Sequence, residues 1–180
     1  PRPIASAPAL GDFKTSLWQP WQNSAFKRLL LVFVVSGIAS AIPATLVLFF
    51  VQDVLHAPAA QEPWFLATYF LCAALSMPLW LRAVARLGLA RSWLAGMLLA
   101  VAAFAWTALL GAGDTAAFLV VCALSGAALG ADLALPSALL AGVAAAQGEG
   151  QQQQGAYFGW WNLAAKLNLA LAAGLTLPLL

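Results

Sequence analysis

Charge is what this sequence has least of. Only 8% of the 180 residues are Asp, Glu, Lys or Arg, and 63% are hydrophobic, whereas a soluble domain is about a quarter charged and about half apolar. The apolar residues come in blocks of about twenty or more, which as helices are long enough to cross a hydrocarbon core of about 30 Å. The scarcity of charge excludes a water-soluble protein and indicates a membrane protein.

Cysteine and histidine are also scarce, and their placement argues against an enzyme. Cys72 and Cys122 both lie within apolar blocks, and no CxxC or Cys/His spacing indicates a metal site or a disulfide framework. The sole histidine, His56, has no carboxylate pair at catalytic spacing. The glycine-rich stretches lack the strand, lysine and helix start of a phosphate-binding loop. We therefore expect no enzyme, no resident cofactor and no nucleic-acid partner.

What the sequence does contain is five apolar blocks. They cover about residues 29–51, 64–81, 92–110, 116–143 and 157–180. Each is predicted to be a helix, because an unpaired strand leaves its backbone groups unsatisfied in lipid. Residues 1–28 are predicted to be a cytoplasmic linker and an interfacial segment, in which tryptophans adjoin basic residues. The predicted fold is an all-α membrane protein in which residues 29–180 form one half-domain with five transmembrane helices.

The loops set the orientation. Before the first block and between the second and third, the loops carry Lys and Arg, whereas the loops on the other side carry only acidic charges. The basic residues are Lys14, Lys27, Arg28, Arg82, Arg86 and Arg91, and the acidic ones are Asp53, Glu62 and Asp114. By the positive-inside rule, the N-terminus is cytoplasmic. The chain starts without Met and stops in apolar sequence, so we expect it to be part of a longer protein.

Two charges lie deep inside the apolar blocks. Asp132 and Lys166 each lie about 16 Å from the cytoplasmic side, counted at about 1.5 Å per helical residue. A charge at this depth costs about 2.5 to 3.5 kcal/mol on insertion scales. An ion pair between the two would offset part of that cost. Asp132 is thus either one half of a structural salt bridge beside a packing kink, or a member of a polar pathway.

Neighbouring residues bear on both charges. Pro136 has no N–H, so the carbonyl of Asp132 loses its helical donor, and interrupted helices of this kind line binding cavities in transporters. On the last helix, Asn162 and Lys166 share a stripe with Gly159, Ala173 and Thr176. We expect that stripe to face protein or water. The small-residue match Gly126–Gly130 favours close helix packing, although in an Ala-rich block it is nearly expected by chance.

Several stretches together resemble one transporter family. They are "FKRLLLVFVVSGIASAIPATLVLFFVQDVL", "MPLWLRAVARLGLARSW", "GAALGADLALPSALLAGV" and "GAYFGWWNLAAKLNLALAAGLTLPLL". In order and in loop length they are similar to the glycoside-pentoside-hexuronide:cation symporters, the melibiose-permease branch of the major facilitator superfamily. The resemblance covers about residues 26–180. It implies a twelve-helix fold of which this chain supplies spans seven to eleven, with the N-terminal half missing.

The resemblance also implies roles for individual residues. Lys166 falls at the position of a family lysine near the cation and sugar sites, with Asn162 beside it. The segment with Arg82, Arg86, Gly88 and Arg91 resembles the cytoplasmic signature loop of the superfamily. The principal cation-binding carboxylates belong to spans absent here. Where the family often has an Ala-Asp-Val type motif, residues 141–143 read Ala-Gly-Val.

The function implied is that of a bacterial inner-membrane symporter for a sugar or glycoside. It would be coupled to sodium or protons, would work by alternating access in the lipid bilayer, and would need the missing half. Two alternatives remain open. One is a proton-coupled exporter or lipid transporter of the same superfamily, and the other is a small five-span scaffold protein without transport activity.

Overall fold

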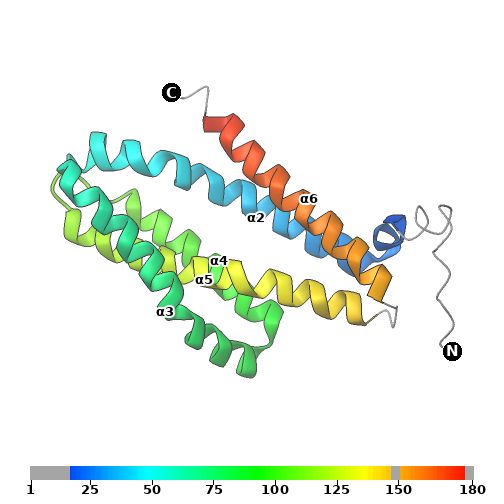
Figure 1. The fold of residues 1–180 in the computed structure, drawn as a ribbon. Helices are drawn as coiled ribbons and strands as arrows, with labels where there is room; N and C mark the ends of the chain where they lie inside the picture. The colour runs from blue at the N-terminus through cyan, green and yellow to red at the C-terminus, as the bar shows by residue number, and fades with distance from the viewer. Residues whose placement is uncertain (1–16, 147–150, 177–180) are drawn as a thin grey trace, which may run out of the picture.

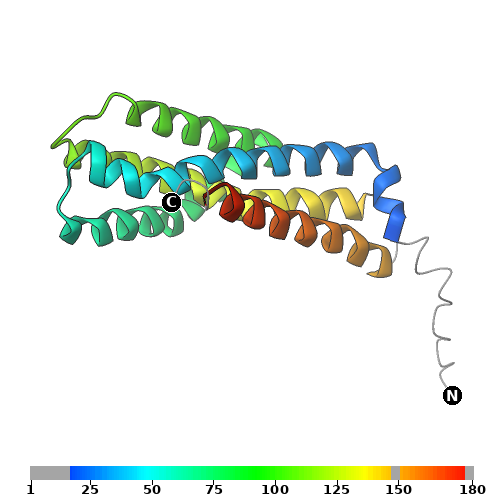
Figure 2. The ribbon, with the colours of Figure 1, turned by 90° about the horizontal axis from the view of Figure 1, so that it is seen from above.

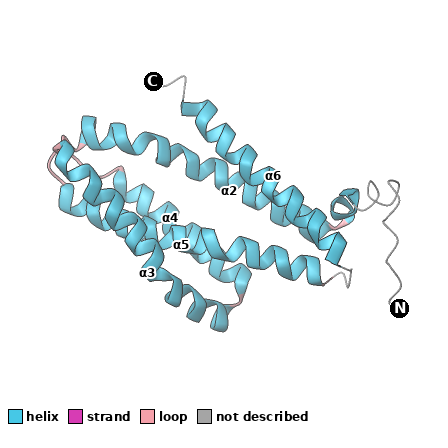
Figure 3. Ribbon diagram, in the orientation of Figure 1, coloured by secondary structure: helices cyan, strands magenta, loops and turns pink. Residues whose placement is uncertain are grey.

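The computed structural model describes residues 17–146 and 151–176, and its regular elements within that part are all helices (Figure 1, Figure 3). The long helices are α2 (Ser24–Phe49), α3 (Glu62–Leu87), α4 (Leu89–Thr107), α5 (Thr115–Ala145) and α6 (Gln151–Thr176). The short ones are the 3-10 turns η1 (Gln19–Gln22) and η3 (Ala59–Gln61) and the π turn η2 (Phe50–Val54). Residues 1–16, which hold most of the predicted linker, lie outside the described part.

Within residues 17–146 and 151–176, four helical segments are long and apolar enough to cross a membrane. They are Ser24–Val54, Ala59–Leu87, Leu89–Thr107 and Thr115–Ala145. They correspond to the first four predicted blocks. The α6 segment is helical as expected, but it is not one of these candidates, so the fifth span stays a prediction.

Helix ends differ from the predicted block limits for a physical reason. The apolar block 64–81 lies inside the longer α3, because hydropathy marks only the part suited to lipid and polar residues can continue a helix beyond it. The α4 helix instead ends at Thr107, before the predicted Leu110. Its last turn tightens into i→i+3 bonds, such as Leu109 N–H to the Trp106 carbonyl at 2.9 Å.

The α5 helix is the centre of the bundle and lies between α3 and α4 (Figure 2). Its glycines allow the helix backbones to approach closely. A Cβ at Gly126 would overlap the backbone of Tyr69, and one at Gly130 would overlap the Ser76 hydroxyl. On the other side, a Cβ at Gly96 of α4 would overlap the Ala131 methyl. The small-residue match is therefore a packing seam here, since close approach is what holds helices together in lipid.

Hydrogen bonds reinforce the seam between α3 and α5. The Trp80 indole Nε1–H donates to the Ala127 carbonyl at 2.7 Å, and the Ser76 hydroxyl donates to the same carbonyl at 3.2 Å. Ser76 is buried, so its hydroxyl needs these partners. Side-chain donors thus join the two backbones beside Gly130.

The α2 and α6 helices form a second unit, in which α6 crosses α2 (Figure 1). Aromatic rings fill their contact: Phe33 stacks on Trp161 at 3.9 Å between ring centroids, and Phe26 meets the Tyr157 ring edge to face at 5.1 Å.

Residues before α2 also contact α6. We call the contact of Trp160 with Trp18 and Trp21 the aromatic clasp; its centroid distances are 5.7 and 5.2 Å, and the Trp160 Nε1–H donates to the Leu17 carbonyl at 2.8 Å.

Charges separate to the two ends of the bundle. The starts of α2 and α4 and the end of α3 carry Lys27, Arg28, Arg82, Arg86 and Arg91, and we call this the basic end. The opposite end carries Asp53, Glu62 and Asp114. There the Gly113 N–H donates to the Leu55 carbonyl at 3.1 Å, which ties the two connections together. The fold therefore agrees with the charge pattern on which the predicted orientation rests.

The packing seam yields a stability test. Gly126→Ala places a methyl group against the Tyr69 backbone, which cannot move as a side chain can, so we expect a loss of about 1 to 3 kcal/mol. Gly142→Ala on the same helix is the control, because nothing lies within 4 Å of its added Cβ. Thermal unfolding in detergent checks this. Equal midpoints for the two variants would contradict the seam.

Candidate functional site

Asp132 is held by a tryptophan of the neighbouring helix. The Trp93 Nε1–H of α4 donates to Asp132 Oδ1 of α5 at 2.7 Å. Trp93 is only 5% exposed, and Asp132 is half-buried. This distance is at the short end of the range for an N–H···O hydrogen bond. Helix α4 reaches α5 so closely because Gly96, one turn after Trp93, packs against Ala131.

Trp93 was not among the residues that the sequence singled out. A buried indole needs an acceptor for its N–H, and the intramembrane acceptors are few. The available signal was its place in the first turns of a predicted span, one turn from a glycine. That signal does not say which helix faces it, so the pair emerges only from the fold.

Pro136 is buried one turn after Asp132, but it does not break the helix. The expected interruption of this span is absent, because α5 continues from Thr115 to Ala145 through the proline. Neighbouring helices pack along α5 and hold its course. Pro136 therefore contributes packing here, and the structure gives it no further contact with a polar group in the described part.

Lys166 and Asn162 lie on the exposed side of α6. Both side chains are exposed, whereas Tyr157, Trp161 and Ala164 are buried. Within the described residues, Lys166 has no hydrogen bond or ion pair, and the ion pair with Asp132 suggested by depth is not formed. The side chains of Ala173 and Thr176, which complete the predicted stripe, lie outside the described part.

The basic segment between α3 and α4 is a one-residue connection. Gly88 has φ = 82°, a backbone conformation that glycine adopts at little cost, and its N–H donates to the Val84 carbonyl at 2.9 Å. It thus ends α3 and starts α4 at once. The side chains of Arg82, Arg86 and Arg91 are exposed around it. These residues occupy the basic end, as the loop prediction requires.

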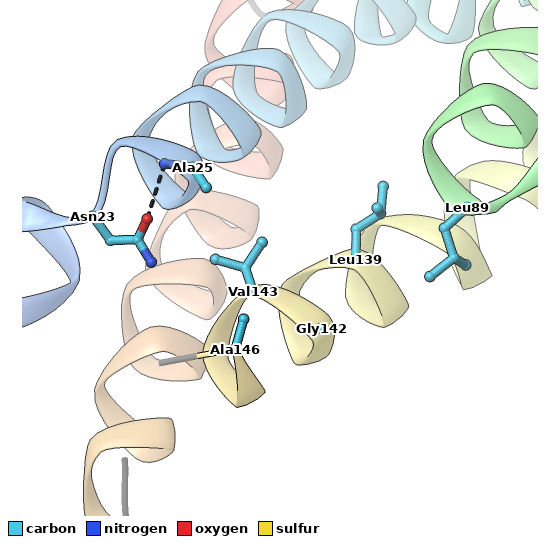
Figure 4. A pocket seen from close by; sticks show the side chains of 7 residues that line it. All are labelled: Asn23, Ala25, Leu89, Leu139, Gly142, Val143 and Ala146. Atoms are coloured by element: carbon cyan, nitrogen blue, oxygen red, sulfur yellow. Dashed lines mark hydrogen bonds between the residues drawn. The ribbon is translucent and has the colours of Figure 1, made fainter. Parts of the chain in front are cut away.

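A shallow pocket opens at the same end, between the starts of α2 and α4 and the end of α5 (Figure 4). Its volume is about 280 Å³, and its lining residues are Asn23, Ala25, Leu89, Leu139, Gly142, Val143 and Ala146. Asn23 is the only polar side chain among them, and it is already engaged. Its Oδ1 accepts from the Ala25 N–H at 2.9 Å, and its Nδ2 donates to the Tyr157 hydroxyl at 3.2 Å.

The pocket and the intramembrane charges are therefore separate features. The pocket has no ionisable lining residue, and neither Asp132 nor Lys166 borders it. In the described part of the chain, no group of three or more His, Cys, Asp or Glu side chains is placed to hold a metal ion. The candidate site residues consequently form two places: a satisfied carboxylate between α4 and α5, and an open amine on α6.

The Trp93–Asp132 bond leads to a double-mutant test. Trp93→Phe keeps the ring but removes the donor, which leaves the half-buried Asp132 carboxyl without this partner, so we expect a loss of about 1 kcal/mol. In an Asp132→Leu background the same change should cost less, with a coupling of about 0.5 kcal/mol or more. Chemical denaturation in detergent measures both losses. Strictly additive losses would refute the coupling.

Comparison with known proteins agrees with this architecture. Over residues 12–180 the chain matches the family model described as MFS/sugar transport protein. No curated protein and no solved structure gives a significant match. The matched range includes all the described helices and both Asp132 and Lys166. The chain therefore belongs to the MFS/sugar transport protein family, within the major facilitator superfamily.

Proposed function

We propose that this chain is part of a cation-coupled symporter for a sugar or glycoside, of the melibiose-permease type, that works by alternating access. The family match supports a transporter of small molecules. The observation that carries the proposal further is Lys166, midway along α6, which is exposed and has no ion-pair partner among the described residues. The coupling cation would be sodium or a proton.

The free-energy cost of placing a charged amine in lipid explains why the face of α6 with Lys166 matters. Lipid contact would leave the Lys166 charge without compensation, at a cost of about 2.5 to 3.5 kcal/mol. Snorkelling reaches only about one turn, which is short for a residue at this depth. Protein or water must therefore cover Lys166 in the membrane. A water-filled cavity between two transporter halves provides both.

Asn162 extends the same face by one turn toward the start of α6. Its amide offers both a donor and an acceptor, and Lys166 offers three donors. Sugar hydroxyls are donors and acceptors in turn, so this pair suits them. In this proposal Lys166 and Asn162 line the substrate and cation pathway from this half.

Asp132 has a supporting role in the proposal. Trp93 holds its carboxylate between α4 and α5, and Pro136 packs one turn away on the same helix. Asp132 and Pro136 would shape the wall behind the pathway. Cation-binding carboxylates would come from the other half of the transporter.

The basic end would face the cytoplasm of a bacterial cell, in the inner membrane. Five Lys and Arg side chains gather there, as the positive-inside rule requires: Lys27, Arg28, Arg82, Arg86 and Arg91. Gly88 and the three arginines around it would form the cytoplasmic signature loop, and the two halves would rock around a site near the midplane.

Replacement of Lys166 tests the proposal directly. In the full-length protein, Lys166→Ala should abolish most cation-dependent sugar uptake, because the amine is needed in the pathway. It should leave unfolding nearly unchanged, since Lys166 makes no contact within the described residues that the fold needs. Uptake of labelled sugars into proteoliposomes, with sodium and proton gradients imposed in turn, measures the first effect.

The control variant is Leu167→Ala on the same helix. Leu167 is 54% exposed and apolar and lies about 100° around the helix from Lys166, so its truncation should change neither uptake nor folding. Uptake that survives Lys166→Ala with unchanged cation dependence would overturn the role proposed for the lysine. Uptake without any cation dependence in the parent protein would instead favour another transporter class of the superfamily.

A further inference from the structure

A second asparagine on α6, Asn168, contacts α2. Asn168 is two residues after Lys166, and its Nδ2 donates to the Phe33 carbonyl of α2 at 3.5 Å. The side chain is half-buried, and its Oδ1 is buried without a hydrogen-bond partner among the described residues. A polar side chain thus sits in the middle of a helix contact whose rings and apolar side chains include Phe33 and Trp161.

Gly37 creates the space for this side chain. A Cβ at Gly37 would overlap Asn168 Nδ2 and would lie 2.8 Å from its Cγ. In a regular helix the Phe33 carbonyl already accepts from the Gly37 N–H. Asn168 therefore adds a second donor to that carbonyl, directly over the glycine. By contrast, a Cβ at Gly155 or Gly159 of α6 meets nothing within 4 Å.

Asn168 lies on the same face of α6 as the buried residues that pack against α2. Tyr157, Trp161, Ala164 and Asn168 follow one another at spacings of 4, 3 and 4 residues, so they share one helix face. The first three are buried. A lone Asn at a core position of such a face is a known device that fixes helix register and lowers stability in exchange.

Rotation follows from register. Successive helical residues turn by about 100°, so Lys166 lies about 200° from Asn168, almost on the opposite side. Asn162 precedes Lys166 by four residues and shares its side. While Asn168 rests on Gly37, both pathway residues point away from α2. Among the described residues the Asn168 Oδ1 has no hydrogen-bond partner, and an apolar side chain at this position would leave no such orphaned acceptor.

We propose that Asn168 is a positioning residue: seated on Gly37, it sets the register and rotation of α6 so that Lys166 and Asn162 face the pathway. This inference rests on the proposed function for its role in transport. The geometric part does not depend on transport and is tested separately.

The test measures how accessible the side chain at position 166 is to water. In full-length protein with Cys72→Ala and Cys122→Ala, Lys166→Cys is labelled with a membrane-impermeant thiol reagent. Asn168→Ala should slow the labelling severalfold, because α6 loses its fixed rotation. Gly37→Ala should also slow it, since the new methyl displaces the amide. The double variant Gly37→Ala with Asn168→Ala should be labelled as fast as Asn168→Ala alone, because the two substitutions remove the same contact between Gly37 and Asn168. Leu167→Ala, which lies about 100° around α6 from position 166, serves as the control and should leave the rate unchanged.

Two results would overturn the proposal: unchanged labelling in folded Asn168→Ala and Gly37→Ala proteins, or additive effects of the two changes. If Gly37→Ala alone does not fold, recovery of folded protein in the double variant supports the contact, and failure to recover it overturns the contact. In protein with Lys166 intact, Asn168→Ala should also reduce sugar uptake severalfold. If Lys166→Ala leaves uptake intact, the proposed function fails, yet the labelling still reports on Asn168.

Discussion

Close approach of helix backbones is the constraint on which this bundle depends. Apolar side chains gain little by leaving lipid for protein, so helices associate where small residues bring main chains within reach of one another. Gly126 and Gly130 bring α5 onto α3, and Gly96 brings α4 onto α5. Gly37 does the same for α2 and α6, but there it admits a side chain instead of a backbone. Each contact also places a polar bond: Trp80 on a carbonyl, Trp93 on Asp132, and Asn168 on a carbonyl.

Asp132 and Lys166, the two charges within the predicted apolar blocks, have opposite surroundings in the fold. Asp132 belongs to the tightly packed unit of α3, α4 and α5, where an indole N–H satisfies it. Lys166 belongs to the α2 and α6 unit and remains open. A satisfied carboxylate stabilises a wall, whereas an amine without a partner is available to a substrate. This division explains why level depth in two adjacent helices did not produce an ion pair.

The sequence was enough to predict the helical class, the positions of the first four spans and the separation of charge between the two ends. These features depend on composition and on local periodicity, which can be read from each segment without knowing which other segments it packs against. It was not enough to predict the partner of Asp132, because depth along an axis does not specify rotation about it. Pro136 predicted an interrupted helix, but packing along α5 keeps the helix continuous. Asn168 escaped notice because its meaning depends on Gly37, which lies far away in the sequence.

The composition of α5 has a consequence for how the protein is made. Its apolar stretch has a mean hydropathy of 2.0 although half of that stretch is buried in the bundle, while the first span has a mean hydropathy of 2.3 with only 11% buried. A helix surrounded by protein does not need such hydropathy once assembled. It needs it earlier, when it enters the bilayer before its neighbours have closed around it. Two sets of residues in α5 therefore act at different times: its leucines and valines let the nascent segment partition into lipid alone, and its glycines later let it exchange part of that lipid for the backbones of α3 and α4.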